Sequence, residues 1–237
     1  MRRTLIVVAA LALVGFGGAA ALWRVTKSRT FQFFGRIVAR AETPQRVVAL
    51  TFDDGPTEKT AEVLRVLGEK GVRATFFVTG AELERNMEAG RSIVAAGHQL
   101  GNHSYSHERM LLVTPSFVRR EVERTDELIR AAGYEGEIYF RPPYGKKLFA
   151  LPLYLSRRGR VTVTWDVEPD SDADARADAE AVTRDVLSKT RPGSIILLHV
   201  MYPSRAETLK AVPLVIDALA REGYRFVTVS ELLAASR

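Results

Sequence analysis

Apolar runs alternate with amphipathic stretches from residue 46 to the end of the chain. Each apolar run has the length of a β-strand, and the stretches between the runs carry apolar residues at helical spacing. Runs that are almost wholly apolar indicate parallel strands that are buried on both faces. The predicted strands are 46–54, 73–80, 98–103, 137–143, 160–168, 193–200 and 224–229, and the predicted helices are 57–71, 81–96, 115–132, 148–158, 174–190 and 205–222.

Two α/β architectures fit this alternation, a barrel and an open doubly wound sheet. No Gly-x-Gly-x-x-Gly follows the first predicted strand, so the sequence does not indicate a dinucleotide-binding fold. Polar residues gather instead at the carboxyl ends of the strands, where barrel enzymes place their catalytic groups. The sequence therefore predicts a (β/α) barrel of about seven parallel strands, in one domain that spans residues 45–237.

An uncharged segment precedes the predicted domain. Residues 4–23 contain no charged side chain and are long enough, at ~1.5 Å per residue, to cross ~30 Å of hydrocarbon. We therefore predict a transmembrane anchor in residues 1–24, while Ala19–Ala21 leaves a cleaved signal peptide open. In this interpretation residues 25–44 are a juxtamembrane linker. We expect the predicted domain to lie outside the cytoplasm, on a single-pass membrane protein or, after cleavage, as a secreted or periplasmic one.

The formal net charge of +6 is concentrated near the N-terminus. Residues 1–40 contain seven basic and no acidic side chains, whereas residues 41–237 contain 27 basic and 28 acidic ones, a net charge of −1. The predicted domain thus lacks the basic surface typical of nucleic-acid binding, and we expect no nucleic-acid partner and a monomeric catalytic domain. The chain has no cysteine, so any metal must be held by histidines and carboxylates.

Chemically capable side chains lie at the predicted strand ends. Asp53 and Asp54 end the first strand in TFDDGP, and His103 and His107 follow the third strand in HSYSH. If HSYSH forms a helical turn, its two imidazoles share one face. Two imidazoles and one strand-end carboxylate form a site for zinc or another divalent ion, with open positions for water.

Two further motifs follow along the chain. In RPPYG, Arg141 is a permanent cation that can hold a carboxylate ionised, and the backbone N–H of Tyr144 can donate to an oxyanion. The apolar strand IILLH ends with His199, and apolar surroundings can tune an imidazole to act as a general acid near neutral pH. A surface turn for RPPYG and a structural role for His199 stay open. His98, at the start of a strand, is expected to be structural.

Residues of about 46 to 233 resemble the NodB-homology polysaccharide deacetylases, the fourth family of carbohydrate esterases. The motifs TFDDGP, HSYSH, RPPYG and ILLH carry this resemblance, and they occur in the same order as in that family. The resemblance implies a distorted, incomplete (β/α) barrel. It also implies a metal-dependent hydrolase that removes N-acetyl groups from a polymeric amino sugar. One divalent ion is expected, zinc first, with cobalt or nickel as alternatives. The resemblance implies that Asp53 is the catalytic base, positioned by Arg141, and that the metal ligands are Asp54, His103 and His107. It also implies that Tyr144 supplies the oxyanion donor, that His199 is the general acid, and that Leu197 lines the acetyl pocket.

The fourth motif departs from the family. The family usually has an Asp followed directly by Trp after the fifth strand, whereas this chain reads TWDVEPDSD, with Trp165 before the acids and no Trp after them. Four acids can take the role of tuning the general acid, namely Asp166, Glu168, Asp170 and Asp172, and Asp170 is our choice. One wall of the substrate groove is therefore undefined. We expect Pro142, Tyr144, Trp165 and Leu197 to contact the substrate.

The substrate stays open at this point. Peptidoglycan N-acetylglucosamine, chitin-like oligomers and exopolysaccharide fit an N-deacetylase, and O-acetylated xylan would require the same chemistry on an ester. A glycoside hydrolase is a poor fit, because its two carboxylates flank the bond at least ~5 Å apart, whereas Asp53 and Asp54 are neighbours. A metal-bearing glycan-binding module without activity would need neither Asp53 nor His199.

Overall fold

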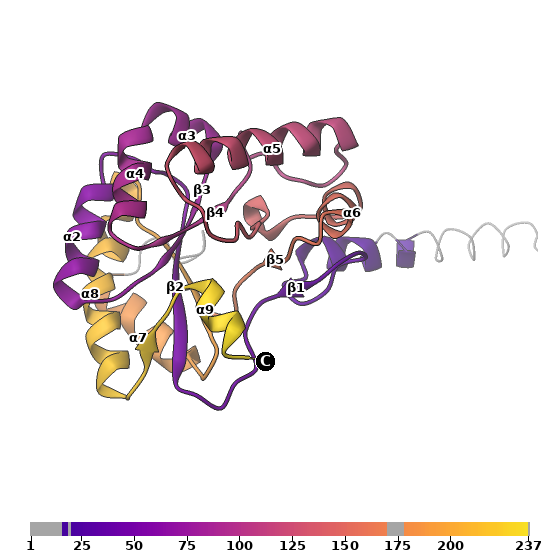
Figure 1. Cartoon of the computed structure of the whole chain (residues 1–237). Helices are drawn as coiled ribbons and strands as arrows, with labels where there is room; N and C mark the ends of the chain where they lie inside the picture. Colours follow the sequence, from indigo (N-terminus) through magenta and orange to yellow (C-terminus); the bar gives the residue numbers. More distant parts are fainter. Residues whose placement is uncertain (1–15, 19, 170–177, 237) are drawn as a thin grey trace, which may run out of the picture.

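Val47–Asp53 forms β2, the central strand of the fold (Figure 1). The computed structural model describes residues 16–18, 20–169 and 178–236. Every residue of β2 is buried and parallel strands pair with it on both sides, which explains why its sequence, VVALTFD, is almost wholly apolar. The prediction of an α/β fold with parallel strands is confirmed. The other strands are β1 (Ile37–Val38), β3 (Thr75–Val78), β4 (Gln99–Asn102), β5 (Thr162–Val163), β6 (Ile195–His199) and β7 (Arg225–Phe226).

The strand pairings follow a ring. Its regular half has the order β4-β3-β2-β6, and all of these pairs are parallel. In its irregular half, single parallel bridges join Asn102 to Phe140, Phe140 to Thr162 of β5, and Val167 to Ile196 of β6. β1 pairs with β5, and β7 pairs with the first residues of β2. One half of the ring is thus a continuous sheet, and the other is held by isolated contacts.

Helices cover the outside of the regular half (Figure 1). α7 packs against α8, and α8 in turn contacts α2. Alternate residues of β2, namely Val48, Leu50 and Phe52, belong to the hydrophobic cluster that these helices share with the sheet. The helices are α2 (Thr60–Lys70), α3 (Gly80–Arg85), α4 (Met87–Ala95), α5 (Pro115–Ala131), α6 (Ala150–Arg157), α7 (Ala179–Lys189), α8 (Ala206–Arg221) and α9 (Val229–Ala234), with 3₁₀ turns at Pro143–Gly145 and Pro203–Arg205.

The other face of β2 looks into the ring. Val47 and Ala49 pack in a second cluster with Phe77, Trp165 and Leu197, which come from different sides of the ring. Because side chains alternate along a strand, the next members of this inward row are residues 51 and 53. The alternation of side chains along β2 therefore directs Thr51 and then Asp53 into the interior of the ring, at the carboxyl end of the strand.

Two predicted strands of the irregular half are wrong over most of their length. Of residues 137–143, only Phe140 forms a strand-like bridge, because Pro142 and Pro143 have no N–H to donate to a neighbour. Of residues 160–168, only the two residues of β5 pair as a strand.

The last predicted strand, 224–229, is also shorter than expected. β7 ends at Phe226, and Thr228 is the N-cap of α9. The Thr228 hydroxyl accepts a hydrogen bond from the N–H of Glu231 at 3.3 Å, and the Glu231 carboxylate accepts one from the N–H of Thr228 at 2.8 Å. These two bonds form a capping box, T-x-x-E, at the start of α9. The helix start therefore falls within the stretch 224–229, whose apolar residues predict a strand.

Two predicted helices begin or end elsewhere. α2 starts at Thr60, three residues later than predicted, and the Thr57 hydroxyl before it donates to the carbonyl of Met201 at 2.6 Å and accepts the N–H of Lys59 at 3.2 Å. The predicted helix 81–96 is divided into α3 and α4 at Asn86, which has non-helical φ and ψ of −124° and 46°. The Asn86 side chain donates to the carbonyl of Pro56 at 2.9 Å, so the break joins this helix pair to the turn after β2.

The segment before β2 packs against the domain along much of its length. Residues 20–27 are helical, and the carbonyl of Arg36 accepts a hydrogen bond from the N–H of Thr162 at 3.0 Å, next to the β1–β5 pair. Phe33 stacks on Phe149 with ring centroids 4.9 Å apart. The stretch 25–44, which the sequence predicts as a linker, therefore supplies a strand and aromatic contacts to the irregular half.

Most of the predicted transmembrane segment lies outside the described residues, which begin at residue 16 and omit residue 19. Among the residues that are described, no helix has both the length and the apolar character needed to span a bilayer.

Candidate active site

The carboxyl ends of β2, β4 and β6 meet at one rim of the ring, around a cavity of about 620 Å³. Asp53 is the last residue of β2, His103 follows β4 directly, and His199 is the last residue of β6. The register of the β2–β6 pair sets Asp53 beside His199 and Thr51 beside Leu197. The sequence-predicted residues that line this cavity are Asp53, Asp54, His103, His107, Tyr144, Trp165, Leu197 and His199.

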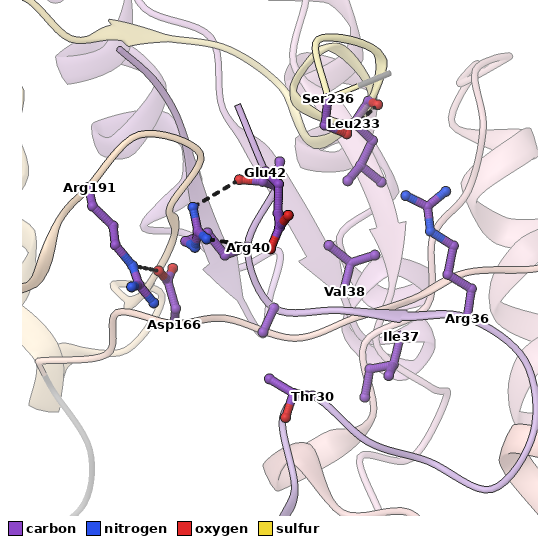
Figure 2. Close-up of a pocket in the computed structure, with 12 residues that line it drawn as sticks. Thr30, Arg36, Ile37, Val38, Arg40, Glu42, Asp166, Arg191, Leu233 and Ser236 are labelled. Atoms are coloured by element: carbon purple, nitrogen blue, oxygen red, sulfur yellow. Dashed lines mark hydrogen bonds and ion pairs between the residues drawn. The ribbon is translucent and has the colours of Figure 1, made fainter. Parts of the chain in front are cut away.

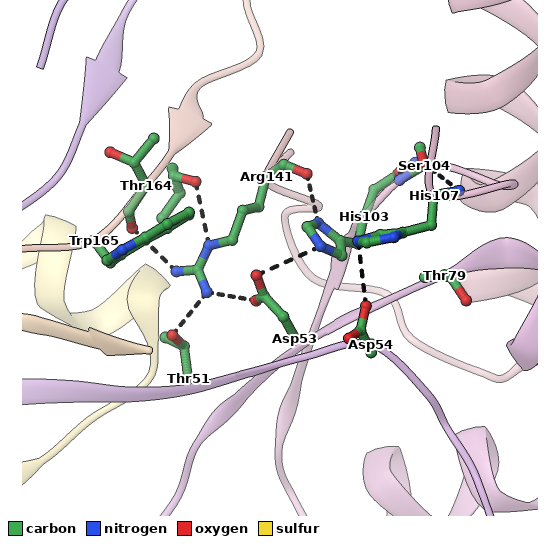
Figure 3. Close-up of polar contacts among 12 residues, drawn as sticks. Thr51, Asp53, Asp54, Thr79, His103, Ser104, His107, Arg141, Thr164 and Trp165 are labelled. Atoms are coloured by element: carbon green, nitrogen blue, oxygen red, sulfur yellow. Dashed lines mark hydrogen bonds and ion pairs between the residues drawn. The ribbon is translucent and has the colours of Figure 1, made fainter. Parts of the chain in front are cut away.

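Asp53 forms a buried ion pair with Arg141 (Figure 3). Arg141 Nη1 lies 2.6 Å from Asp53 Oδ1, and both side chains are 2% exposed or less. Burial alone would raise the pKa of Asp53, but the charge of Arg141 and the neighbouring imidazoles of His103 and His199 outweigh it, so the pKa is lowered. Asp53 is therefore a carboxylate at neutral pH, as a proton acceptor must be.

The guanidinium of Arg141 is held on several sides. Its Nη1 also donates to the Thr51 hydroxyl at 2.8 Å, its Nη2 to the carbonyl of Thr164 at 3.1 Å, and its Nε to the carbonyl of Val163 at 3.3 Å. The Phe77 ring lies under the guanidinium, 3.9 Å from centroid to Cζ. These contacts fix the orientation of the planar guanidinium, and the guanidinium in turn fixes the position of the Asp53 carboxylate.

Asp54, His103 and His107 form a group that could hold a metal ion. One ligand atom from each side chain lies within 4.8 Å of the others, and His107 Nε2 is 3.3 Å from Asp54 Oδ1. His103 Nδ1 is 2.7 Å from the carbonyl of Arg141, which can only accept, so Nδ1 carries the proton and Nε2 is left as the ligand atom. The donor set suits a divalent transition metal with open coordination positions.

The electrostatics of these residues also fit a bound cation. Burial raises the pKa of Asp54, and the carboxylates of Asp53 and Glu82 add to this effect against the nearby histidines. Burial, with the charge of His103, lowers the pKa of His107 to about 4, so its imidazole is neutral at neutral pH. A neutral imidazole is the form that binds a metal, and a cation would stabilise the ionised form of Asp54.

The two candidate metal-ligand histidines meet through an irregular loop. Residues 103–107 do not form the helical turn that would put both imidazoles on one face, because Ser104 and His107 both have left-handed backbones, with φ of 65° and 60°. The N–H of His107 donates to the Ser104 hydroxyl at 3.1 Å, and the two imidazole centroids are 4.9 Å apart. The loop is anchored from α5 by buried Glu121, which accepts hydrogen bonds from the N–H groups of Tyr105 at 3.0 Å and Ser106 at 2.8 Å.

The turn after β2 brings the second carboxylate into the same cavity. Asp54 has φ of 71°, so the backbone reverses at the position where a regular strand would point its side chain to the outer face. Gly55 continues the left-handed path, and a Cβ there would lie 2.9 Å from Met201 Cγ, so only glycine fits. Glu82 accepts the N–H of Gly55 at 2.7 Å and closes the turn.

Backbone strain is concentrated at this site. Asp54, Ser104, His107 and Tyr144 are the non-glycine residues with positive φ in the described part of the chain, and each lies in or next to the cavity. Such conformations cost about 1–3 kcal/mol each and persist where the surrounding structure enforces them. The residues of the cavity are thus placed by a backbone geometry that neighbouring hydrogen bonds maintain.

The residues expected to contact the substrate are placed differently. Tyr144 is half exposed, and its ring centroid is 4.7 Å from that of His107, while Leu197 is buried at the floor of the cavity. Trp165 is almost wholly buried, and its Nε1 donates to Glu168 at 2.8 Å. Pro142 is buried and does not line the cavity.

The acids after Trp165 do not act as one group. Figure 2 shows Asp166 in a second cavity, where it lies 3.6 Å from Arg191. It also accepts hydrogen bonds from the Ser194 hydroxyl at 3.0 Å and the N–H of Ile195 at 2.9 Å. Glu168 forms an ion pair with Arg29 at 2.7 Å. Asp170, our sequence-based choice, and Asp172 lie outside the described residues.

Some residues of the site were missed by sequence reasoning. Lys27 and Arg29, from the predicted linker, line the cavity together with Arg109 and Lys146. The sequence shows them as isolated basic residues far apart in the chain, and no motif connects them. Glu121 also had no local signal, because it appears as one acid among several on an amphipathic helix.

The comparison with known families agrees with this geometry. The family model described as polysaccharide deacetylase matches residues 40–174, more than half of the chain. The chain belongs to the polysaccharide deacetylase family. The family predicted from the four motifs is therefore confirmed. Members of this family are metal-dependent hydrolases, in agreement with the group formed by Asp54, His103 and His107.

Two curated relatives cover most of the chain. A peptidoglycan-N-acetylglucosamine deacetylase of Bacillus cereus is 34% identical over 193 residues, which are 80% of this chain and 69% of that protein. A chitooligosaccharide deacetylase of a Bradyrhizobium species is 34% identical in an alignment of 200 positions that covers 79% of this chain and 90% of that protein. The two relatives carry different substrate names, so similarity alone does not select a glycan.

Two similar crystal structures differ in activity. The Bc1960 peptidoglycan N-acetylglucosamine deacetylase superimposes with a TM-score of 0.77 at 31% identity, over 84% of this chain and 92% of that one. BA3943 of Bacillus anthracis, a CE4 family pseudoenzyme, gives a TM-score of 0.75 at 26% identity, over 84% of this chain and 69% of that one. Since this fold occurs with and without activity, the fold alone does not determine catalysis, which depends on the residues that line the cavity.

Proposed function

We propose that the protein is a metal-dependent deacetylase that hydrolyses N-acetyl groups on a polymeric amino sugar. One observation carries the proposal: an ionised, arginine-held carboxylate, a group of three candidate metal ligands and a strand-end imidazole share one cavity. The candidate substrates are peptidoglycan N-acetylglucosamine, chitin-like oligomers and exopolysaccharide. A binding module would have no use for the buried Asp53–Arg141 pair.

Asp54, His103 and His107 would hold the metal, and zinc is our proposal for it, with cobalt or nickel as ions that the same donors accept. When bound, the ion supplies Lewis-acid activation of water and of the acetyl carbonyl. The Nδ1–H bond of His103 to the Arg141 carbonyl orients one ligand, so the arginine segment supports the metal group as well as the base.

Asp53 takes the role of general base in this proposal. It is ionised, and Arg141 holds its Oδ1 at 2.6 Å, while its Oδ2 lies 3.5 Å from His103 Nε2 of the candidate metal group. Asp53 would accept the proton of the attacking water. The backbone N–H of Tyr144, held in a left-handed turn, would donate to the acetyl oxygen as negative charge develops on it.

His199 takes the role of general acid. It stands beside Asp53 in the β2–β6 register, and Leu197 lies two residues before it on the same face, where the acetyl methyl group would pack. An amide releases a poor leaving group unless its nitrogen is protonated, so a proton donor favours an N-acetyl substrate over an O-acetyl ester. Asp170 remains our proposal for the acid that tunes His199.

The test measures acetate released from N-acetylchitopentaose, peptidoglycan and acetylated xylan by the full chain. The proposal predicts release from an N-acetylated glycan, loss of release with a chelator, and recovery with added zinc. Release from xylan alone would replace it by an O-acetyl esterase. Shortened oligomers with intact acetyl groups would indicate a glycosidase, and no release from any glycan by folded, zinc-loaded protein would indicate a binding module.

We also propose that residues 1–24 carry the domain across a membrane, as an anchor or as a cleaved signal. The support is the uncharged run of residues 4–23 after two arginines. Fractionation of cells that express the full chain, with N-terminal sequencing of the product, tests this. Recovery of the uncleaved protein in the cytoplasmic fraction would contradict it.

A further inference from the structure

The catalytic cavity contains more basic than acidic side chains. Its acidic members are already engaged, since Asp53 pairs with Arg141, Glu168 pairs with Arg29, and Asp54 belongs to the candidate metal group. The basic members are more numerous. Among the residues that the structure describes, the lining includes five basic side chains, Lys27, Arg29, Arg109, Lys146 and Arg205, against three acidic ones, Asp53, Asp54 and Glu168.

Three of these cations, Lys27, Arg109 and Lys146, form what we call the cationic rim. In the part of the chain that the structure describes, no carboxylate forms an ion pair with any of them. They lie on aromatic rings instead: Lys27 Nζ and Lys146 Nζ are 4.4 Å and 5.4 Å from the Trp23 centroid, and Arg109 Cζ is 4.7 Å from that of Tyr144.

The rim residues are close enough to repel one another. Burial lowers the pKa of Lys146, and the charges of Lys27 and Arg109 lower it further. Like charges that are gathered without a counter-ion raise the free energy of the empty site. An anionic ligand that enters the cavity would remove this repulsion, so the rim favours a ligand with negative charge.

One member of the rim, Lys27, belongs to a segment outside the family match, which begins at residue 40. Contacts of the next two residues attach this segment to the domain. The carbonyl of Arg29 accepts the Thr164 hydroxyl at 2.6 Å, and the carbonyl of Ser28 accepts a hydrogen bond from the buried ammonium of Lys147. The segment is thus an integral wall of the cavity, where it contributes Lys27 and Arg29 to the lining.

We propose that the cationic rim binds a carboxylate carried by the glycan near the acetylated sugar, so that the enzyme prefers an acidic N-acetylated glycan to a neutral one. The inference rests on the proposed function and narrows its substrate class. A neutral chitin-like chain would leave three cations unpaired in the occupied cavity, whereas a glycan with one carboxylate per disaccharide would supply their counter-ion. The position of the cations inside the catalytic cavity favours the substrate itself as the anion.

The test compares two tetrasaccharides of equal length. One alternates N-acetylglucosamine with N-acetylmuramic acid that has free carboxylates, and the other is neutral N-acetylchitotetraose. Dissociation constants are measured by calorimetry on zinc-loaded Asp53→Asn protein, which binds without turnover, and thermal unfolding verifies that each variant is folded. With the rim intact, we expect the acidic ligand to bind about tenfold more tightly, since each exposed charge pair contributes about a two- to fivefold effect.

The variant Lys27→Gln/Arg109→Gln/Lys146→Gln should bring the ratio of the two dissociation constants close to one. Lys146→Gln alone should reduce it about threefold, which provides a milder variant should the triple one unfold. The matched control is Arg225→Gln, which removes an exposed cation at the opposite end of β2 and should leave the ratio unchanged. With the intact rim, the ratio should fall as salt rises from 0.05 to 0.5 M.

An equal affinity for both ligands with the intact rim, or a preference that survives the triple substitution, would overturn the inference. Binding does not depend on turnover, so this outcome is separate from failure of the proposed function. That failure would appear as an absence of acetate release from any glycan by the unmodified, zinc-loaded enzyme.

Discussion

The two halves of the strand ring do different work. The regular half, β4-β3-β2-β6, carries at its carboxyl ends the groups proposed to react or to bind metal: Asp53, Asp54, His103 and His199. The irregular half, held by single bridges and covered by the N-terminal segment, supplies Arg141 and the walls of the cavity. Regular pairing fixes the separation of the reacting groups, as the register of Asp53 and His199 illustrates.

The difference has a physical origin. Hydrogen-bonded parallel strands place successive side chains at set intervals, so a reacting group at a strand end is positioned to within a fraction of an ångström. Irregular segments are free to change length and composition, and in this chain they supply the basic residues Lys27, Arg29 and Lys146 of the cavity wall. We therefore expect substitutions in the regular half to change turnover, and those in the irregular half to change stability or substrate preference.

The largest effect is expected for His199→Ala, in the regular half. Loss of the proton donor should reduce kcat for an N-acetylated oligomer by about 10²- to 10⁴-fold, because the amine then leaves unprotonated. Zinc content and the unfolding midpoint should change little. Acetate release measures kcat, and metal analysis measures the zinc content. His98→Gln is the control, because His98 is a histidine outside the cavity. Turnover of His199→Ala near the unmodified rate would remove His199 from the mechanism.

Arg141→Met probes the irregular half. The substitution leaves Asp53 buried without its counter-ion, so the free energy of unfolding should fall by about 3–5 kcal/mol, and activity should be lost with it. Urea denaturation measures the change. Arg158→Met is the matched control, because its partner Glu123 and Arg158 itself are solvent-exposed, and its cost should stay below about 1 kcal/mol. Equal costs for the two variants would contradict the buried pair.

Glu121→Ala tests the support behind the metal ligands. Without this acceptor the N–H groups of Tyr105 and Ser106 lose their anchor, the loop between His103 and His107 loosens, and zinc affinity should fall about 10- to 100-fold. Competition with a chelator measures the affinity. Glu123→Ala, two residues along the same helix, is the control and should bind zinc normally; an equal loss for both would assign the effect to the helix and not to the loop.

The smallest effect concerns the opposite end of the regular half. His98 is buried before β4 and accepts the N–H of Ala74, and burial lowers its pKa from 6.5 to about 4. Between these pH values the unfolded chain binds more protons, so the free energy of unfolding should fall as pH drops from about 6.5 to 4, by about 2 kcal/mol for this residue. Urea denaturation at pH 7.5, 5.5 and 4.5 measures the slope.

His98→Gln keeps a side-chain acceptor for Ala74 and removes the titrating group. Its stability should depend less on pH than that of the unmodified protein, while acetate release at pH 7.5 is retained. An identical pH dependence in both proteins would show that the pKa of His98 is the same in the folded and the unfolded chain, against this prediction.

Sequence reasoning located the regular half well. Apolar runs predicted β2, β3 and β6, because a strand that is buried on both faces consists of nearly uninterrupted apolar residues. The strand-end motifs then identified the residues that the cavity brings together. The predictions failed where the local pattern does not determine the backbone: HSYSH forms a loop with left-handed residues, and 224–229 contains a helix cap.

The irregular half was largely beyond prediction. β1 and β5 have two residues each, too few to give a periodic signal, and their pairing joins segments 125 residues apart. The contacts of Arg29 with Glu168 and of Lys147 with Ser28 depend on that pairing, so the basic wall of the cavity could not be read from any single stretch. The role of Asp170 stays a prediction.

The central claim is that consecutive residues, Asp53 and Asp54, do separate work. The most direct measurement is the zinc content and acetate release of Asp53→Asn and Asp54→Asn, purified side by side and verified as folded by circular dichroism. We predict that Asp53→Asn retains zinc and loses about 10²- to 10⁴-fold in turnover, whereas Asp54→Asn loses both zinc and turnover. Zinc retained equally by both variants, or turnover retained by Asp53→Asn, would contradict the account.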